Sequence, residues 1–211
     1  MPNWTFNTLS VSGNEEILAD FVSKTIIPST ENDYDNRGKF TFNILHPIPE
    51  PLRGEFSPLR MNEGETEEEY KERLEENKRL YGATDWYDWS VANWGTKWNA
   101  CHSQVEEVED DYLNVRFDTA WSPPLDWFYK IIPMFPELDF DLIFDMEGDD
   151  NCGLMTGRNG EWNLEWDYKY YVDEDGIRLE YNIENGKWFY PDTKEVIDDE
   201  DFYPIDVNPF A

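Results

Sequence analysis

The sequence predicts an α+β fold of the ferredoxin-like class, in which two βαβ units form a sandwich that shares one sheet. A strand pattern, a helix pattern and a second strand pattern follow one another within residues 3–49. A β-hairpin pattern, a helix pattern and a further strand pattern follow over residues 97–146, after a charged and tryptophan-rich segment. Aromatic residues make up 17% of the 211 residues, so large rings can fill a core between the sheet and its helices.

The first βαβ unit is expected at the N-terminus. Residues 3–12 alternate in side-chain character, as in a strand that is partly covered on both faces. Asn14 is placed to cap a helix whose apolar stripe includes Leu18, and Pro28 ends that helix. Residues 39–49 then predict the second strand of the unit, because large apolar residues recur there at every other position.

A helical insertion is expected over about residues 52–96. A long, highly charged helix begins there with a capping box formed by Thr66 and Glu69. A shorter helix rich in tryptophan follows, and Gly95 is its expected C-terminal cap.

The second βαβ unit follows the insertion. A β-hairpin is expected over residues 97–121, a helix over residues 122–135 and a strand with one apolar face over residues 138–146. Residues 1–153 would thus form the ferredoxin-like domain, including its insertion.

The remaining residues, 154–211, predict an additional antiparallel β meander that packs on the same core. Short aromatic segments are separated there by turn sequences, of which Asn159–Gly160 and Asp175–Gly176 are the strongest. The last part of this segment is acidic and then rich in proline, which favours an extended arm.

Net charge limits the partners that the protein can have. The chain has 47 acidic and 17 basic residues, and its formal net charge is −30. Nucleic acid phosphates and anionic membranes repel such a chain, so neither is expected as a direct partner. Solubility, metal binding or imitation of a polyanion would each explain the excess of acids. We expect no signal peptide and no membrane span, and the two cysteines fit a reducing cytoplasm.

Three clusters of carboxylates are candidates for a surface that binds a partner protein; the alternative is that each is a solvated turn. On a rigid sheet or helix, such clusters could imitate the phosphates of DNA and occupy a basic groove on the partner. Because ions screen this attraction, the hypothesis predicts binding that weakens sharply as salt rises. The candidate residues are Glu106, Glu107, Glu109, Asp110, Asp111, Asp145, Glu147, Asp149, Asp150, Asp198, Asp199, Glu200 and Asp201.

Four tryptophans fall between residues 86 and 98, and two interpretations compete. In the first, their rings pack the insertion onto the sheet, and nearby polar groups accept hydrogen bonds from the indoles. In the second, rings and amides shape a pocket that binds a small molecule or a nucleotide. The residues of this pocket would be Trp86, Trp89, Asn93, Trp94, Lys97, Trp98 and Trp121.

No catalytic or cofactor motif is complete. The sequence lacks a phosphate-binding glycine loop, a nucleophile elbow and a zinc-protease motif, and we expect no cofactor and no metal. Cys101, His102 and Asp118 are the residue types of a nucleophilic triad, but neighbours on a strand point to opposite faces. Cys101 and His102 are therefore not expected to meet, and no catalytic residue is nominated.

Several blocks of sequence resemble one known family. They are MPNW at the start, DWYDW and NWGTKWNA within 85–100, FDTAWSPP at 117–124, FPELDF at 135–140 and FDMEGDDNCG at 144–153. Together they resemble the YubB-type ferredoxin-like family, which phages and conjugative plasmids carry. The resemblance covers roughly residues 1–153. It implies a ferredoxin-like fold, a mobile-element origin and a bacterial cytoplasm, but no chemistry, because the family has no defined role.

The expected function is therefore that of a non-catalytic phage or plasmid accessory protein. It would bind a host protein with a basic surface, such as a nuclease or another defence factor, through acidic residues that imitate DNA. The alternative is the pocket beside the tryptophans, which would bind a small molecule or nucleotide or carry out catalysis.

Overall fold

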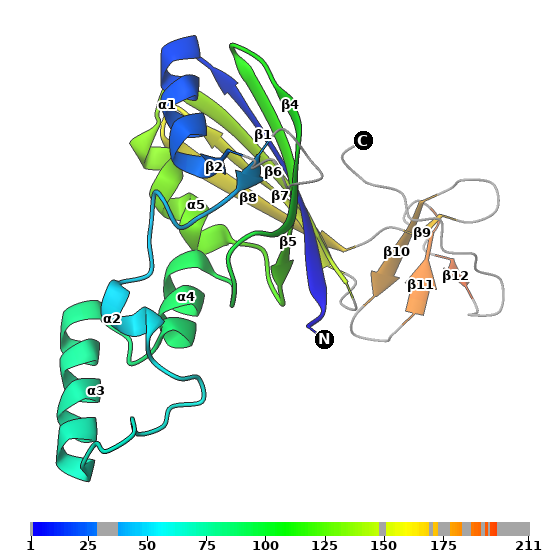
Figure 1. Cartoon of the computed structure of the whole chain (residues 1–211). Coiled ribbons are helices and arrows are strands. Elements are labelled where there is room, and N and C mark those ends of the chain that lie inside the picture. Colours follow the sequence, from blue (N-terminus) through cyan, green and yellow to red (C-terminus); the bar gives the residue numbers. More distant parts are fainter. Residues whose placement is uncertain are drawn as a thin grey trace.

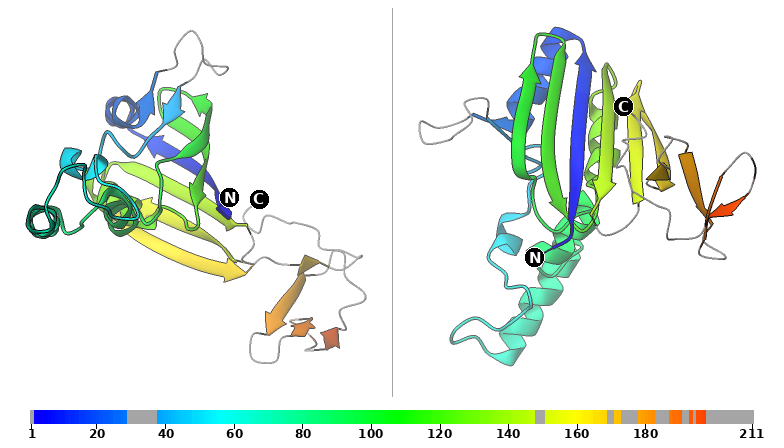
Figure 2. Two further views of the ribbon diagram at one scale, coloured as in Figure 1. Left: turned by 60° about the horizontal axis from the view of Figure 1, so that its bottom comes forward. Right: turned by 90° about the vertical axis from the view of Figure 1, so that its right-hand side faces the viewer.

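The computed structural model describes residues 2–28, 38–147, 151–168, 171–172, 178–182, 187–190, 193 and 195–197. Its centre is a six-stranded antiparallel sheet with the order β4-β5-β1-β6-β7-β8 (Figure 1). Helices α1 and α5 pack on one face, and no described helix covers the other, which we call the open face (Figure 2). These elements are β1 (Trp4–Gly13), α1 (Glu15–Thr25), β4 (Cys101–Val108), β5 (Tyr112–Ala120), α5 (Leu125–Ile131), β6 (Leu138–Met146), β7 (Asn151–Arg158) and β8 (Glu161–Tyr168).

The order of the first four strands is that of a ferredoxin-like fold. The first βαβ unit consists of β1, α1 and β4, and its two strands lie on either side of β5 in the sheet. In the second unit, β5 and β6 are joined through α5 and flank β1. Each unit therefore contributes a strand to the middle of the other, and all neighbouring pairs are antiparallel. The predicted α+β, ferredoxin-like class is confirmed, and β7 and β8 extend the sheet beyond β6.

The prediction of a strand over residues 39–49 is wrong. Only Lys39–Phe40 (β3) is extended, and it pairs with Ile26–Ile27 (β2) as a separate two-stranded sheet. Phe42 is also buried, and the chain turns directly after it. Apolar residues recur at every other position because the rings of Phe40 and Phe42 both pack against Phe117 on β5, with ring centroids 4.9 and 5.8 Å from that of Phe117. The strand that completes the first βαβ unit is β4.

Helix α1 begins and packs as its sequence predicts. The side chain of Asn14 accepts hydrogen bonds from the backbone N–H groups of Glu16 and Ile17, at 3.0 and 3.3 Å. Phe21 is buried, and its ring meets that of Phe135, just after α5, edge-on with the centroids 5.3 Å apart. Aromatic contacts of this kind join both helices to one core.

The insertion contains three helices, α2 (Glu50–Arg53), α3 (Glu67–Tyr81) and α4 (Trp86–Trp94). Helix α3 projects away from the sheet (Figure 1). The predicted capping box is present, since Glu69 N donates to Thr66 Oγ1 and Thr66 N donates to the Glu69 carboxylate. Asp85 caps the start of α4, and Gly95 ends it with the left-handed φ of 80° that favours glycine.

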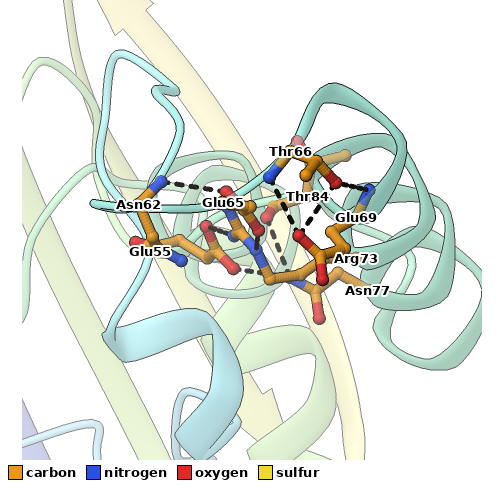
Figure 3. Close-up of polar contacts among 8 residues, drawn as sticks. All are labelled: Glu55, Asn62, Glu65, Thr66, Glu69, Arg73, Asn77 and Thr84. Atoms are coloured by element: carbon orange, nitrogen blue, oxygen red, sulfur yellow. Dashed lines mark hydrogen bonds and ion pairs between the residues drawn. The ribbon is translucent and has the colours of Figure 1, made fainter.

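A polar network holds α3 against the segment that precedes it (Figure 3). The guanidinium of Arg73 binds the carboxylates of both Glu55 and Glu65, with Nε 2.7 Å from Glu65 Oε1. Asn77 Nδ2 donates to Glu55 Oε1 at 3.0 Å and to the Thr84 carbonyl at 3.3 Å. Because the two glutamate side chains are only 7% and 10% exposed, each needs these partners. The network thereby positions a helix that has little apolar surface of its own.

Strands β7 and β8 are joined by the predicted tight turn. Asn159 and Gly160 have φ values of 54° and 75°, the left-handed pair that a two-residue hairpin turn of this type requires. The boundary predicted between the ferredoxin-like domain and the C-terminal meander, at residues 153 and 154, falls within β7. This strand pairs with β6 in the central sheet.

Four further strands form a sheet of their own with the order β12-β11-β10-β9. The predicted turn at Asp175–Gly176 lies outside the described residues. These strands are β9 (Tyr171–Val172), β10 (Arg178–Asn182), β11 (Lys187–Phe189) and β12 (Val196–Ile197). Across the described parts of the chain, the helices are too short or too polar to cross a membrane.

Candidate functional site

The hairpin between β4 and β5 carries a cluster of five acids, four of which are exposed. Glu106 and Glu107 lie near the end of β4, and the next three acids form the turn. This turn lies beside the start of α1, because Gly13 N donates to the Asp111 carbonyl at 3.1 Å. Glu15, which sequence reasoning missed, is thus brought to the same place. We call the group the acidic end, and its residues are Glu15, Glu106, Glu107, Glu109, Asp110 and Asp111.

Two adjoining depressions mark the surface of the acidic end. The first, of about 550 Å³, is lined only by acids: Glu15, Glu109, Asp110 and Asp111. The second, of about 520 Å³, lies between α1 and β4. Its lining combines three glutamates with three aliphatic residues, namely Glu106, Glu107, Glu109, Val22, Ile26 and Val108. Glu109 belongs to both, so the two depressions meet at this residue.

Little positive charge offsets the acidic end. Arg116 Nε lies 3.7 Å from Glu106 Oε1, and the arginine side chain is 69% exposed, so this ion pair is weak. Within the described parts of the chain, Glu107 and the three acids of the turn have no cation at ion-pair distance. Their charge is therefore available to a partner.

The second acidic cluster lies at the opposite end of the sheet. Asp145 is the β6 partner of Phe6 near the start of β1, and Trp4 N donates to Glu147 Oε2 at 3.0 Å. The hairpin instead meets the far end of β1, where Ser12 pairs with Tyr112. Ser12 lies six positions after Phe6 along the strand, or about 20 Å at roughly 3.3 Å per residue. The structure therefore does not bring these two predicted clusters together.

The rest of the predicted acidic residues lie outside the described residues. They are Asp149, Asp150, Asp198, Asp199, Glu200 and Asp201. On the open face, one basic group, Arg158, contacts two acids of β6. Arg158 Nη2 contacts both carboxylate oxygens of Asp141, at 2.7 and 2.9 Å, and Arg158 Nε lies 3.7 Å from Asp139. Asp139 is the β6 partner of Ser12, so these acids lie toward the hairpin end of β6, where Arg158 partly neutralises them.

Two of the four clustered tryptophans belong to the hydrophobic core. Trp89 and Trp94 are buried, and Trp94 Nε1 donates to the His46 carbonyl at 2.9 Å. Asn93 is occupied too, because its side-chain oxygen accepts from Lys130 Nζ at 3.0 Å and lies 3.2 Å from His46 Nε2. Trp86, on the same helix, is half-buried.

The other tryptophans of the predicted pocket lie beside the start of β1, because Trp98 packs against Trp4 and Trp121 N donates to the Asn3 carbonyl at 3.0 Å. Trp98 packs against Trp4, with ring centroids 6.1 Å apart, and Lys97 Nζ lies 4.8 Å from the Trp98 ring. Trp121 is 52% exposed and has a φ of 76°. A left-handed conformation is rare for so bulky a residue, and such strain often accompanies a functional site.

The strict alternation expected around Cys101 and His102 is interrupted, but among the described residues their side chains make no hydrogen bond with each other. A β-bulge interrupts β4 after Cys101, and His102 has a φ of 47°. Asp118 is the register partner of Cys101, and its Oδ2 lies 2.7 Å from His102 Nδ1, so Asp118 lies beside both residues. Burial, together with the charge of Asp118, raises the pKa of the Cys101 thiol. A nucleophilic cysteine needs the opposite shift.

Comparison with known proteins gives a family model that agrees with the fold. Residues 93–177 match a family model described as the ferredoxin-like domain in Api92-like protein. That match spans less than half of the chain and includes β4 to β8. Among solved structures, the chain is similar to the crystal structure of protein api92 from Yersinia pseudotuberculosis. The identity is 10% and the TM-score 0.47, over 80% of this chain and 98% of that one. No curated protein matches the sequence.

Proposed function

We propose that the protein is a non-catalytic accessory protein that binds a host protein with a basic surface through its acidic end. One observation carries the proposal: Glu15 and the three acids of the hairpin turn, Glu109, Asp110 and Asp111, line one depression, and within the described parts of the chain the turn acids have no cation at ion-pair distance. The proposed setting, a phage or plasmid protein in a bacterial cytoplasm, rests on the sequence resemblance to the YubB-type family. Nucleases and other defence factors that bind DNA are the class of partner that this charge fits.

The hairpin is suited to presenting charge at fixed positions. Val105, Leu113 and Val115 anchor its two strands in the core, where all three are fully buried. Carboxylates on such a support repel one another, and a basic partner relieves that repulsion when it docks. Because Asp145 and Glu147 lie at the other end of the sheet, imitation of DNA is assigned to the acidic end alone. Electrostatic complementarity of this kind mainly speeds association and makes it sensitive to salt.

The test begins with capture of binding proteins from a bacterial lysate at low and high salt, followed by association rates for a purified partner. One variant neutralises three acids of the turn, and a matched control neutralises three exposed acids around α3. The turn variant should lower the association rate at low salt by about tenfold or more and flatten its salt dependence. The control should not. The two sets are Glu109→Gln, Asp110→Asn and Asp111→Asn, against Glu63→Gln, Glu72→Gln and Glu75→Gln. Equal behaviour of the two variants, or binding indifferent to salt, would refute the proposal.

A pocket beside the tryptophans is the second candidate function, for a small molecule or nucleotide. The specific support is the pairing of His102 with Asp118 beside Trp4 and Trp98, together with the strained and exposed Trp121. Titration with a panel of nucleotides should then quench tryptophan fluorescence to saturation. Trp121→Ala should abolish that response while leaving the protein folded. Lack of any saturable response across the panel would eliminate this candidate.

A further inference from the structure

We infer that the acidic end recognises a partner segment in which a basic side chain lies next to an aliphatic side chain. The basic group would enter the depression lined by Glu15, Glu109, Asp110 and Asp111. The aliphatic group would enter the depression lined by Val22, Ile26 and Val108. This inference rests on the proposed function and adds the chemistry of the segment that is bound.

The two depressions meet at Glu109, so adjacent side chains of one segment can occupy both. The first offers only carboxylates, which a lysine or arginine complements. The second offers aliphatic side chains beside glutamates, which an aliphatic group with a neighbouring cation complements. A purely polyanionic surface would attract any basic protein, whereas the aliphatic depression adds a preference among them.

Val108 is the residue that distinguishes this surface from a plain acidic patch. Its register partner on β5, Leu113, is fully buried, which places both on the side of the sheet that the helices cover. Unlike Leu113, however, Val108 is 48% exposed, because it lies at the edge of the sheet. An exposed aliphatic group among glutamates gains from burial by a partner, because removal of apolar surface from water is favourable.

The structure favours recognition through side chains over addition of a strand to the sheet. β4 is an edge strand of the central sheet, which could in principle pair with an extended segment. However, its pairing with β5 shifts register twice, between Cys101 and Gln104 and between Val105 and Glu107. Bulges and charges of this kind are devices that protect an edge strand from pairing.

A basic partner fits these depressions better than a second copy of the chain does. Each copy carries a formal net charge of −30, so two acidic ends would repel each other. The occupant is therefore a segment of another protein that supplies both positive charge and aliphatic surface.

Two fluorescein-labelled synthetic peptides of equal length and charge test the inference, one alternating lysine with leucine and the other lysine with serine. Fluorescence anisotropy at low salt should give the leucine peptide an affinity about tenfold higher for the unmodified protein. Val108→Ser should reduce this difference to within about twofold without changing the affinity for the serine peptide. The matched control is Val91→Ser, because Val91 is 42% exposed on α4 and lies outside both depressions.

Each outcome separates this inference from the proposed function. Equal, salt-sensitive binding of both peptides would overturn the inference and leave the proposed function standing. Binding of neither peptide would count against both. If Val91→Ser also lost the preference for the leucine peptide, that preference would arise from non-specific adsorption to exposed apolar residues. This result would overturn the inference. Analytical ultracentrifugation could instead show that the protein self-associates and that Val108→Ser abolishes the self-association. The occupant would then be a second copy of the chain, and the inference would be overturned.

Discussion

The imidazole of His46 lies against the indole of Trp89, with ring centroids 5.0 Å apart and planes inclined by 35°. The two residues are joined further through α4, because Trp94 donates to the His46 carbonyl and Asn93 contacts the His46 ring. These contacts bind the tryptophan-rich helix to the loop that follows β3. Part of the tryptophan cluster is therefore structural, and substitutions within it should separate stability from binding.

Trp94→Ala should lower the free energy of unfolding by about 3–5 kcal/mol, because it removes a fully buried ring and leaves a cavity. Trp121→Ala should lower it by much less than Trp94→Ala does, because about half of that side chain is already exposed. Urea denaturation followed by far-UV circular dichroism measures both. A Trp94→Ala protein as stable as Trp121→Ala would contradict the packing described here.

His46 should titrate below its ordinary pKa of 6.5. Burial lowers the pKa of His46, the hydrogen bond with Asn93 raises it, and the nearby charge of Lys130 lowers it, with burial dominant. The unfolded chain therefore takes up the proton first, so stability present above pH 6.5 is lost as the pH falls through the folded pKa. The chain has only two histidines, so NMR can assign the imidazole of His46 by comparison with His46→Gln. A midpoint at or above 6.5 would show that the ring is not desolvated as described.

The network around Arg73 should make the insertion sensitive to acid. Hydrogen bonds from Arg73 lower the pKa of Glu65 from 4.5 to about 2. Because the folded pKa is depressed, the stability is present above pH 4.5 and is lost as the pH falls toward 2. Hydrogen exchange should show the backbone amides of α3 losing protection across this window.

Arg73→Met should disrupt the same network at neutral pH. It leaves two partly buried carboxylates without their cation, so α3 amides should exchange about tenfold faster or more at pH 7. Arg79→Met is the matched control, because the ion pair of Arg79 with Glu76 is exposed and contributes little. Equal exchange in the two variants would mean that the network does not hold α3.

Gly153→Ala should destabilise the junction of β6, β7 and β8 by about 1–3 kcal/mol. A Cβ at this position would lie 2.3 Å from Phe144 Cζ and 2.7 Å from the carbonyl oxygen of Glu165, and the backbone atom cannot move away easily. Gly54→Ala is the control, because its nearest neighbour would be 3.9 Å away and its φ of −81° suits alanine. Thermal melts of both variants decide the matter, and equal melting temperatures would refute the close packing.

The fold class and most of the element boundaries can be predicted from local patterns of residues. Asn14, the Thr66–Glu69 capping box, Gly95 and the Asn159–Gly160 turn act within a few residues of the chain, so their chemistry can be recognised without a structure. The strand expected over residues 39–49 is the exception. A period of two also arises when neighbouring aromatic residues of a loop are drawn into one core.

Which residues share a site depends on contacts between segments that are far apart in the chain. Glu15 joins the hairpin acids because β1 ends beside the hairpin turn, while Asp145 and Glu147 fall at the other end of the same sheet. The bulge after Cys101 places Asp118 beside both Cys101 and His102, against the simple alternation of a strand. Strand order, register and bulges are set by contacts between distant segments, and a linear pattern of residues does not contain them.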